Sequence, residues 1–173
     1  MIIVLMGYMG SGKSTIGIEL AKILDYEFID LDAYIEQKEE MSVSKIFKSK
    51  GEIYFRKAEI FHLKTLLSSE KNTVLSLGGG TPCYANNVDL ILGQESTISF
   101  YLKTSLKELA KRLNPDKENR PLISHLNDEN HLIEFLGKHL FERSGFYSKA
   151  NFTILTDGKS VNETVKNIVA NLV

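Results

Sequence analysis

Nine residues near the start of the sequence have the composition of a phosphate-binding loop. Residues 7–15 read Gly-Tyr-Met-Gly-Ser-Gly-Lys-Ser-Thr and lie between an apolar run at 2–6 and a helical pattern that follows them. The glycines let backbone N–H groups approach phosphate oxygens without side-chain clashes. Lys13 is placed to reach the β- and γ-phosphates, and the Ser14 hydroxyl to ligate Mg²⁺. The order of strand, loop and helix that this mechanism requires is present, so the sequence predicts nucleotide binding.

Two carboxylates, Asp30 and Asp32, lie at the end of the next apolar run, 27–31. We expect a strand of a parallel sheet to end there. Ligands of such sheets bind beyond the carboxyl ends of the strands, which places both side chains near the γ-phosphate and its metal. One carboxylate can then hold Mg²⁺ through water while the other accepts a proton from an attacking hydroxyl. Without the phosphate loop, the same pair would indicate only the solvated start of a helix.

Three consecutive glycines and four dispersed arginines complete the polar candidates. Gly78, Gly79 and Gly80 allow either a close approach of the backbone to a ligand or simply a tight turn. The arginines, at 56, 112, 120 and 143, form no linear patch and can converge only through the fold. Arg120 lies in a charged stretch at 114–121 with two prolines and no apolar residue, which predicts an exposed mobile loop. A guanidinium there could swing onto a transferring phosphoryl group and exclude water.

The elements that must position these residues alternate along the chain. Short apolar runs recur at 2–6, 27–31, 73–77, 97–102 and 151–155, mostly separated by helical patterns, which predicts an α/β fold with a parallel sheet. Capping boxes predict helix starts at Ser105 with Glu108 and at Ser160 with Glu163.

One of the expected helices carries two of the charged candidates. Residues 52–70 predict a single long helix in which Arg56 and Glu59 lie one turn apart. Its expected apolar stripe consists of Ile53, Ile60, Leu63, Leu66 and Leu67.

Length, charge and cysteine content narrow the class of protein. The 173 residues suit one domain that buries about 70% of its unfolded surface. A net charge of −1 without a basic stripe argues against nucleic acid as a partner. The single cysteine, Cys83, fits a reducing compartment, and the run at 2–6 is too short for a signal peptide or a membrane span. We therefore expect a cytoplasmic protein that binds small molecules rather than membranes.

Other reactive residue types give weaker signals. The histidines, at 62, 125, 131 and 139, lack the spacing of a zinc site, so we interpret them as structural or exposed. Cys83 fits the role of a small buried hydrophobe, and neither it nor Tyr84 has an assignable chemical role. No G-x-S-x-G motif is present, so acyl transfer has no support.

Taken together, the motifs resemble those of the shikimate kinase family over nearly the whole chain. In order they are Gly10-Ser11-Gly12-Lys13-Ser14-Thr15, Asp30-Leu31-Asp32, Gly51-Glu52, Phe55-Arg56 with Glu59, Gly78-Gly79-Gly80, Arg120-Pro121-Leu122, and Arg143 with Tyr147. The phosphate loop alone is shared by many unrelated proteins, whereas the other motifs in this order and spacing are specific to the family.

The resemblance implies a fold and a reaction. The fold is a three-layer α/β domain over residues 1–173, with a central five-stranded parallel sheet flanked by helices, a mobile lid at about 113–124 and a substrate-binding segment at about 31–60. The reaction is transfer of the γ-phosphoryl group of ATP, with Mg²⁺, to the 3-hydroxyl of shikimate in aromatic amino-acid biosynthesis. We expect a monomer.

The resemblance also implies a role for each matched residue. Asp32 would bind the ring hydroxyls and act as the base, while Asp30 and Ser14 would hold the metal. The substrate carboxylate would be bound by Arg56 and Arg143, with Glu59 orienting Arg56. The glycine turn, Gly78, Gly79 and Gly80, would line the substrate, with the Gly79 N–H donating to a ring hydroxyl. ATP would be bound by Gly10, Ser11, Gly12, Lys13, Ser14, Thr15, Arg112 at the adenine and Arg120 from the lid; Lys13 and Arg120 would also act in catalysis.

Two other functions fit part of the sequence. Another P-loop kinase, acting on gluconate or a nucleoside monophosphate, would share the loop and the lid arginine but would not explain two arginines for a carboxylate. A non-catalytic nucleotide-binding module would share the loop alone, and the sequence has neither an N-K-x-D nor a D-x-x-G motif. A small anionic polyol needs forked cations at one end and a carboxylate at the other, which this sequence supplies.

Overall fold

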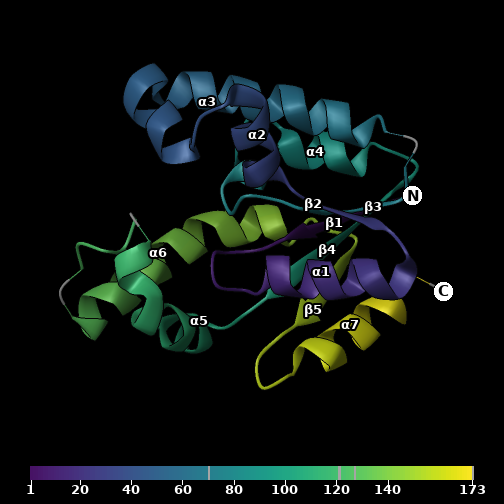
Figure 1. Ribbon diagram of the computed structural model, residues 1–173. Coiled ribbons are helices and arrows are strands. Elements are labelled where there is room, and N and C mark those ends of the chain that lie inside the picture. Colours follow the sequence, from purple (N-terminus) through teal and green to yellow (C-terminus); the bar gives the residue numbers. More distant parts are fainter. Residues whose placement is uncertain (70, 121, 127, 173) are drawn as a thin grey trace.

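A five-stranded sheet, parallel throughout, lies at the centre of the computed structural model, which describes residues 1–69, 71–120, 122–126 and 128–172 (Figure 1). The strands are β1 (Ile2–Met6), β2 (Glu27–Asp30), β3 (Thr73–Ser76), β4 (Thr97–Lys103) and β5 (Phe152–Leu155), in the spatial order β2-β3-β1-β4-β5. In the central strand, Val4 pairs with Leu75 on one side and Ser99 on the other. The predicted α/β class and parallel sheet are confirmed.

Helices cover both faces of the sheet. They are α1 (Lys13–Leu24), α2 (Leu31–Glu39), α3 (Val43–Leu67), α4 (Asn87–Leu92), α5 (Leu106–Leu113), α6 (Glu129–Tyr147) and α7 (Val161–Val169), with short 3₁₀ helices η1 (Thr81–Cys83) and η2 (Asn114–Asn119). No helix in the described part of the chain is long and apolar enough to cross a membrane.

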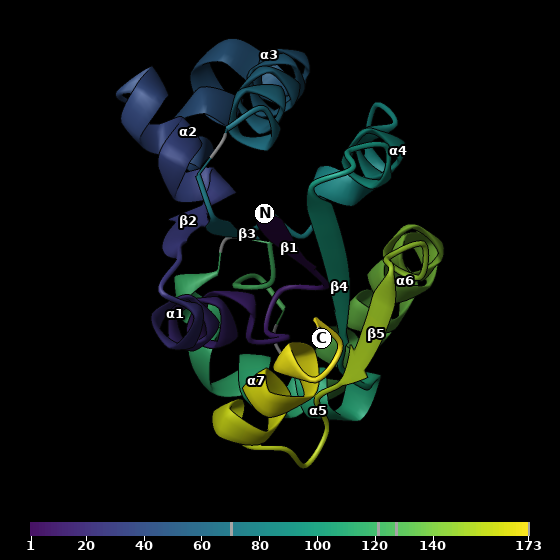
Figure 2. The ribbon, with the colours of Figure 1, turned by 90° about the vertical axis from the view of Figure 1, so that its right-hand side faces the viewer.

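Alternating side chains of β1 divide the core into two layers. Ile3 and Leu5 pack with residues of α1 and α7, whereas Ile2, Val4 and Met6 pack with residues of α3, α4, α5 and α6. Figure 2 shows α1 and α7 below the sheet and α3 and α4 above it. Both faces of β1 are thus buried, which explains why its sequence is apolar without interruption.

The predicted capping box is confirmed in full at α7, but only one of its two hydrogen bonds is confirmed at α5. Ser160 and Glu163 form the complete capping box at the start of α7. At α5 the Ser105 hydroxyl accepts from the Glu108 N–H at 3.3 Å, as predicted. The reciprocal bond was predicted wrongly, because the Glu108 carboxylate accepts from Arg112 at 2.9 Å and the Ser105 N–H donates to Asp157 at 2.9 Å.

Helix α3 differs from its prediction in three respects. It consists of two segments that meet at Gly51, whose φ of 84° and ψ of 168° break the helix, and it ends at Leu67 rather than at residue 70, which is outside the described residues. Ile53 is 77% exposed, so its place in the apolar stripe was wrong. Phe55, about 200° further around the helix, is buried instead.

The charged stretch at 114–121 is not the loop that its composition predicted. Residues Asn114–Asn119 form η2, and Pro115 occupies the first turn, where a missing N–H costs no hydrogen bond. Pro121 of the Arg120-Pro121-Leu122 motif lies outside the described residues.

Replacing Gly51 by alanine tests whether backbone conformation alone fixes the break in α3. A Cβ at Gly51 would meet no atom within 4 Å, so the variant adds no steric clash. Its φ and ψ, 84° and 168°, lie in a region that is essentially restricted to glycine. We expect Gly51→Ala to lower the free energy of unfolding by about 1–3 kcal/mol in urea titrations.

Gly145→Ala in α6 is the matched control for this measurement. A Cβ there also meets no atom within 4 Å, but Gly145 lies within a regular helix. Alanine should therefore leave stability unchanged or raise it by about 0.4–1 kcal/mol. Equal effects of the two substitutions would contradict the explanation for Gly51.

Candidate active site

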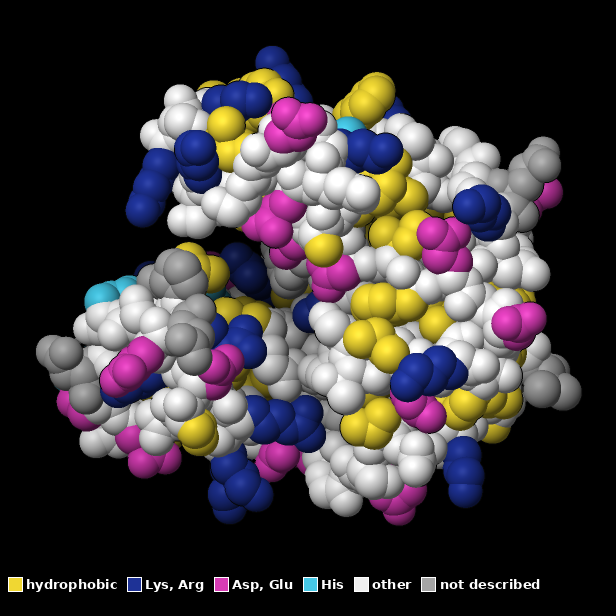
Figure 3. Space-filling view, in the orientation of Figure 1, with side chains coloured by type: hydrophobic (Ala, Val, Ile, Leu, Met, Phe, Trp, Pro, Cys, Tyr) yellow, Lys and Arg dark blue, Asp and Glu magenta, His cyan; other side chains and the backbone are white. Residues whose placement is uncertain are grey.

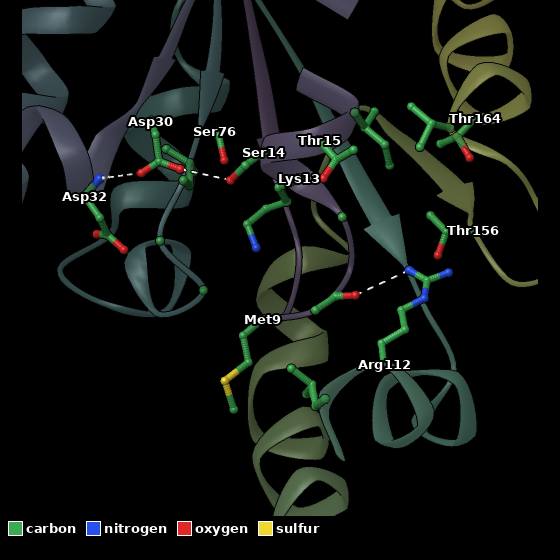
Figure 4. Close-up of a pocket in the computed structure, with 18 of the residues that line it drawn as sticks. Met9, Lys13, Ser14, Thr15, Asp30, Asp32, Ser76, Arg112, Thr156 and Thr164 are labelled. Atoms are coloured by element: carbon green, nitrogen blue, oxygen red, sulfur yellow. Dashed lines mark hydrogen bonds between the residues drawn. The ribbon is translucent and has the colours of Figure 1, made fainter. Parts of the chain in front are cut away.

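A cavity of about 580 Å³ opens at the carboxyl ends of the strands. Figure 3 shows the surface hollowed between the part formed by α2 and α3 and the part formed by α6, with acidic and basic side chains along the hollow. Figure 4 shows Asp30 and Asp32 on one side of the phosphate loop and Arg112 and Thr156 on the other. The cavity therefore brings together groups from β2, the phosphate loop, α5 and the loop after β5. Its lining includes Gly10, Gly12, Lys13, Ser14, Thr15, Asp30, Asp32, Gly78, Gly79, Arg112 and Arg120.

The phosphate loop takes the shape that its glycines allow. Gly10 and Gly12 have φ of 80° and 93°, a conformation that other residues adopt only with strain. Gly12 caps α1, so the N-terminus of that helix faces the cavity with its unpaired N–H groups. The Ser11 side chain, buried within the loop, has no hydrogen-bond partner in the part of the chain that the structure describes. The helix dipole and the N–H groups of the loop together favour negative charge in this part of the cavity.

Lys13 is enclosed in this loop. Its Nζ donates to the carbonyl oxygens of Gly7 at 2.9 Å and Tyr8 at 3.1 Å. Burial lowers the pKa of Lys13 to about 8, although Asp32 and Asp30 act in the opposite direction. The ammonium is thus held where a phosphate charge would stabilise it.

Asp30 links β2 to α2 and to the phosphate loop. Its Oδ1 caps α2 by accepting from the N–H groups of Asp32 at 3.1 Å and Ala33 at 3.3 Å. Its Oδ2 accepts from the Ser14 hydroxyl at 3.1 Å. Two oxygen ligands side by side suit a hard divalent cation. Ser76, whose buried hydroxyl lacks a partner among the described residues, lines the same cavity.

Asp32 has the electrostatics of a proton acceptor. Burial, followed by the charges of Asp30 and Glu59, raises its pKa from 3.8 to about 6. Lys13 acts in the opposite direction. A carboxylate with a pKa close to neutrality binds a proton more readily than an exposed one.

The glycine turn after β3 is surrounded by three of the candidate charged groups. A side chain at Gly78 would come within 2.9 Å of an Asp32 oxygen, and one at Gly80 would come within 3.2 Å of an Arg56 nitrogen. At Gly79 the nearest atom of Arg143 lies 3.8 Å from that position. Glycine at 78 and 80 thus lets a carboxylate and a guanidinium group approach one short turn closely, whereas Arg143 is at ordinary contact distance from Gly79.

Arg56 and the glycine turn share one buried carboxylate. Glu59, only 1% exposed, accepts from Arg56 Nη1 at 2.8 Å and from the Thr81 hydroxyl at 2.6 Å. Arg56 Nε also lies 3.5 Å from a Glu52 oxygen. The expected spacing of Arg56 and Glu59 by one helical turn is confirmed, and it holds the guanidinium beside the turn.

Helix α6 supplies the second arginine and an anchor for the turn. Arg143 lies near Gly79, and the Tyr147 hydroxyl donates to the carbonyl oxygen of the same residue. Tyr147 is fully buried, so α6 and the turn are held together by packing and by this bond. The cavity lining does not include Arg56, Glu59, Gly80 or Arg143. The two arginines lie beside the glycine turn, whose Gly78 and Gly79 are part of the lining.

The other two arginines line the nucleotide side of the cavity. Arg112 donates to Glu108 at 2.9 Å and to the Gly10 carbonyl at 3.3 Å, which places it against the phosphate loop. Arg120 lines the cavity from the end of η2, where its Nε donates to Asp116 at 2.9 Å. Both guanidinium groups are thus paired with acidic side chains of their own segments.

Several residues of the site carried no sequence signal that assigned them a role, apart from Thr156, whose turn resembles the adenine-side turn of the family only approximately. Thr81 bonds Glu59, and Thr156, Lys159 and Thr164 line the cavity beyond Arg112. Threonines and lysines are common on surfaces, so only the fold reveals them. Their nearest sequence signals were the glycine triplet before Thr81 and the Ser160 capping box that positions α7.

Of the histidines, His62 and His139 make contacts within the protein, whereas His125 and His131 are exposed, so the interpretation as structural or exposed residues is confirmed. His62 is buried with its Nε2 3.5 Å from a Glu39 oxygen, and His139 lies 3.3 Å from the Tyr8 hydroxyl. Groups of three or more metal-binding side chains are absent from the described residues. Cys83 is only partly buried against the core, less than predicted, and burial raises the pKa of its thiol.

Comparison with known proteins matches this arrangement. The family model described as shikimate kinase matches residues 9–173. A shikimate kinase of Flavobacterium johnsoniae is 47% identical over 167 residues, which is 96% of either chain.

The chain belongs to the shikimate kinase family.

Solved structures agree with this family and its fold. The crystal structure of shikimate kinase from Bacteroides thetaiotaomicron has a TM-score of 0.89 at 31% identity and covers 99% of this chain and 97% of that one. Shikimate kinase from Acinetobacter baumannii in complex with shikimate has a TM-score of 0.84 at 34% identity and covers 99% and 92%. ATP is the phosphoryl donor that the family implies.

The raised pKa of Asp32 predicts a stabilising substitution. The pKa is 3.8 without burial and about 6 in the fold, so the ionised carboxylate is less favourable in the folded state than in the unfolded state. The penalty is absent when both states are protonated, grows above pH 4 and is complete above pH 6. We expect Asp32→Asn to raise the free energy of unfolding by about 1–3 kcal/mol at pH 8.

Urea titrations of the ligand-free protein at pH 8 and at pH 4 measure this effect. The gain should fall to about 0.5 kcal/mol at pH 4, where the carboxyl is only about half ionised in the unfolded state, which makes the low-pH measurement an internal control. A gain of the same size at both pH values would mean that the amide packs better than the carboxyl, and that charge is not the cause.

Proposed function

We propose that the chain transfers the γ-phosphoryl group of ATP to the 3-hydroxyl of shikimate, giving shikimate 3-phosphate and ADP in aromatic amino-acid biosynthesis. The observation that carries this proposal is the glycine turn, where Gly78, Gly79 and Gly80 face Asp32, Arg143 and Arg56 in that order. The turn thus has a carboxylate at one end and two forked cations at the other. Shikimate is a polyol with one carboxylate, so its two ends match the two ends of the turn.

The acceptor's carboxylate would be bound by Arg56 and Arg143. Guanidinium groups form paired hydrogen bonds with carboxylates, and an ordered guanidinium loses less entropy on binding. The hydrogen bond that Arg56 donates to Glu59 fixes the guanidinium before the substrate arrives, and the bond that Tyr147 donates to Gly79 fixes the turn. The segment at about 31–60 would therefore supply Asp32 and Arg56 to the acceptor site, and α6 would supply Arg143.

Asp32 would act as the base. It accepts the proton of the 3-hydroxyl while that oxygen forms a bond to the γ-phosphorus and the bond from phosphorus to the leaving oxygen of ADP breaks. A pKa of about 6 leaves Asp32 largely ionised at neutral pH. Lys13 and Arg120 would stabilise the charge on the transferring group.

Mg²⁺ would be held by Ser14 directly and by Asp30 through water. The Ser14 hydroxyl and the Asp30 carboxylate, 3.1 Å apart, would be a pair of oxygen ligands beside the loop. The Ser76 hydroxyl, which has no partner among the described residues, can bond a water of the metal. When bound, the ion neutralises phosphate charge.

The adenine and the lid complete the proposed site. The phosphates of ATP would be contacted by Gly10, Ser11, Gly12, Lys13, Ser14 and Thr15. Arg112 would lie against the adenine beside Thr156. The lid at about 113–124 would bring Arg120 onto the phosphates. We further propose a monomeric, cytoplasmic enzyme of one domain, in keeping with a metabolic kinase family and a single cysteine.

A coupled assay of ADP release tests the reaction and its base. With Mg-ATP, we expect release that depends on shikimate and that EDTA abolishes. Gluconate, AMP and a reaction without acceptor serve as controls. Asp32→Asn should lower kcat by about 100-fold or more, because the hydroxyl then lacks a proton acceptor.

Each alternative function gives a different result in this assay. Release driven by gluconate or AMP would make the chain another P-loop kinase. Absence of release with every acceptor, while ATP still binds, would favour the non-catalytic module.

Arg143→Ala tests the assignment of the carboxylate site. Losing a charge-assisted bond should raise the KM for shikimate by about 10–100-fold, with the KM for ATP within about twofold. Lys138→Ala, an exposed residue of the same helix, should change neither constant. An unchanged KM for shikimate in Arg143→Ala would refute the role of Arg143.

A further inference from the structure

Tyr84 lies directly against the guanidinium of Arg56. The guanidinium carbon is 3.7 Å from the centre of the Tyr84 ring, which is close enough for the two planar groups to stack. The Arg56 side chain is only 18% exposed, so much of its surface is covered by protein. Tyr84 comes from the segment after the glycine turn, to which the sequence assigned no chemical role.

The stacking leaves the edge of the guanidinium available for hydrogen bonds. Arg56 Nη1 donates to Glu59, and Nη2 lies toward the turn, 3.2 Å from where a Gly80 side chain would be. Carboxylates bind guanidinium groups in the plane of the fork, whereas an aromatic ring covers the face. Tyr84 and a bound carboxylate therefore need not compete for the same part of Arg56.

A strained turn holds Tyr84 in this position. Ala85 and Asn86, which follow it, have φ of 49° and 57°, a left-handed conformation that is strained for alanine and better tolerated by asparagine. The turn is held by Asn87, a fully buried residue whose N–H donates to the Tyr84 carbonyl at 2.9 Å and whose side chain donates to the Thr81 carbonyl at 3.0 Å.

The position of Tyr84 matters because a rotation of the Arg56 guanidinium out of its present plane would turn its N–H groups away from the carboxylate of the acceptor. Glu59 and Glu52 hold the guanidinium only along its edges, at 2.8 Å and 3.5 Å. Contacts along an edge leave rotation about that edge possible, whereas a ring against the face opposes it. Tyr84, 3.7 Å from the guanidinium carbon, supplies most of the constraint that the two carboxylates do not, since the Phe55 ring lies further away at 5.2 Å.

We propose that Tyr84 is a positioning residue for substrate binding, which acts by stacking on Arg56 and fixing the plane of its guanidinium toward the carboxylate of the acceptor. This inference rests on the proposed role of Arg56. It assigns the contribution to the aromatic ring and none to the hydroxyl.

Three variants in the full-length enzyme test the proposal. Tyr84→Leu keeps an apolar side chain but removes the ring, and it should raise the KM and the calorimetric Kd for shikimate by about 3–30-fold, with kcat and the KM for ATP within about twofold. Tyr84→Phe keeps the ring and should restore wild-type constants within about twofold. Tyr54→Leu is the matched control, since Tyr54 is 38% exposed against 37% for Tyr84 and stacks on Lys50 at 4.2 Å. It should leave the KM for shikimate unchanged.

Three results would overturn the proposal. The first is a KM for shikimate in Tyr84→Leu that equals that of the wild type. The second is an equal loss in Tyr84→Phe, which would assign the effect to the hydroxyl. The third is an equal loss in Tyr54→Leu, or a parallel rise in the KM for ATP, which would show a general loosening of the domain.

A double-mutant cycle with Arg56→Met separates failure of this inference from failure of the proposed site. If Tyr84 acts through Arg56, Tyr84→Leu should add no further rise in the KM for shikimate once Arg56 is methionine. If Arg56→Met raises that KM and Tyr84→Leu does not, Tyr84 alone is refuted. If Arg56→Met has no effect, the role of Arg56 is refuted, and the inference about Tyr84 with it.

Discussion

The site depends on the close packing of charged side chains around the glycine turn, whose three residues have no side chains of their own. Bringing ions out of water is costly unless each is paired. Arg56 and Glu59 are paired with each other, at 2.8 Å, whereas Asp32 and Lys13 are only partly compensated. Burial shifts the pKa of both toward the neutral form, upward for the acid and downward for the base. The ligand-free site is therefore electrostatically unfavourable, and ligands of the right charge relieve it.

The parallel sheet makes this concentration of charge possible. It directs the ends of β1, β2 and β3 to one edge, so the phosphate loop, Asp30 and the glycine turn meet there although they are far apart in the sequence. Helix α2 begins at that edge, and its cap by Asp30 places Asp32 in its first turn. Packing on both faces of β1 fixes the strands, so the charged groups lie on a rigid base.

Sequence reasoning succeeded where a local pattern has one physical meaning. The phosphate loop needs glycines at fixed spacing, Arg56 and Glu59 follow helical periodicity, and Ser160 with Glu163 forms a self-contained cap. These features predict the fold class and bring most of the candidate residues into view.

It failed where a contact outside the local motif decides the outcome. Glu108 was predicted to complete a cap but bonds Arg112, and Asp157 takes its place at Ser105. Ile53 fits a helical stripe, yet the core lies over the opposite side of the same helical turn, where Phe55 is buried, and Ile53 is 77% exposed. The stacking of Tyr84 on Arg56 joins segments that no periodicity relates.

The bond between Tyr147 and the Gly79 carbonyl has a consequence for the next residue. A peptide group is planar and trans, so its carbonyl and the following N–H point in opposite directions. By holding the Gly79 oxygen, Tyr147 also fixes the Gly80 N–H to point away from α6. A hydrogen-bond donor is thereby oriented in advance, and the entropy of ordering it is lost during folding rather than during each turnover.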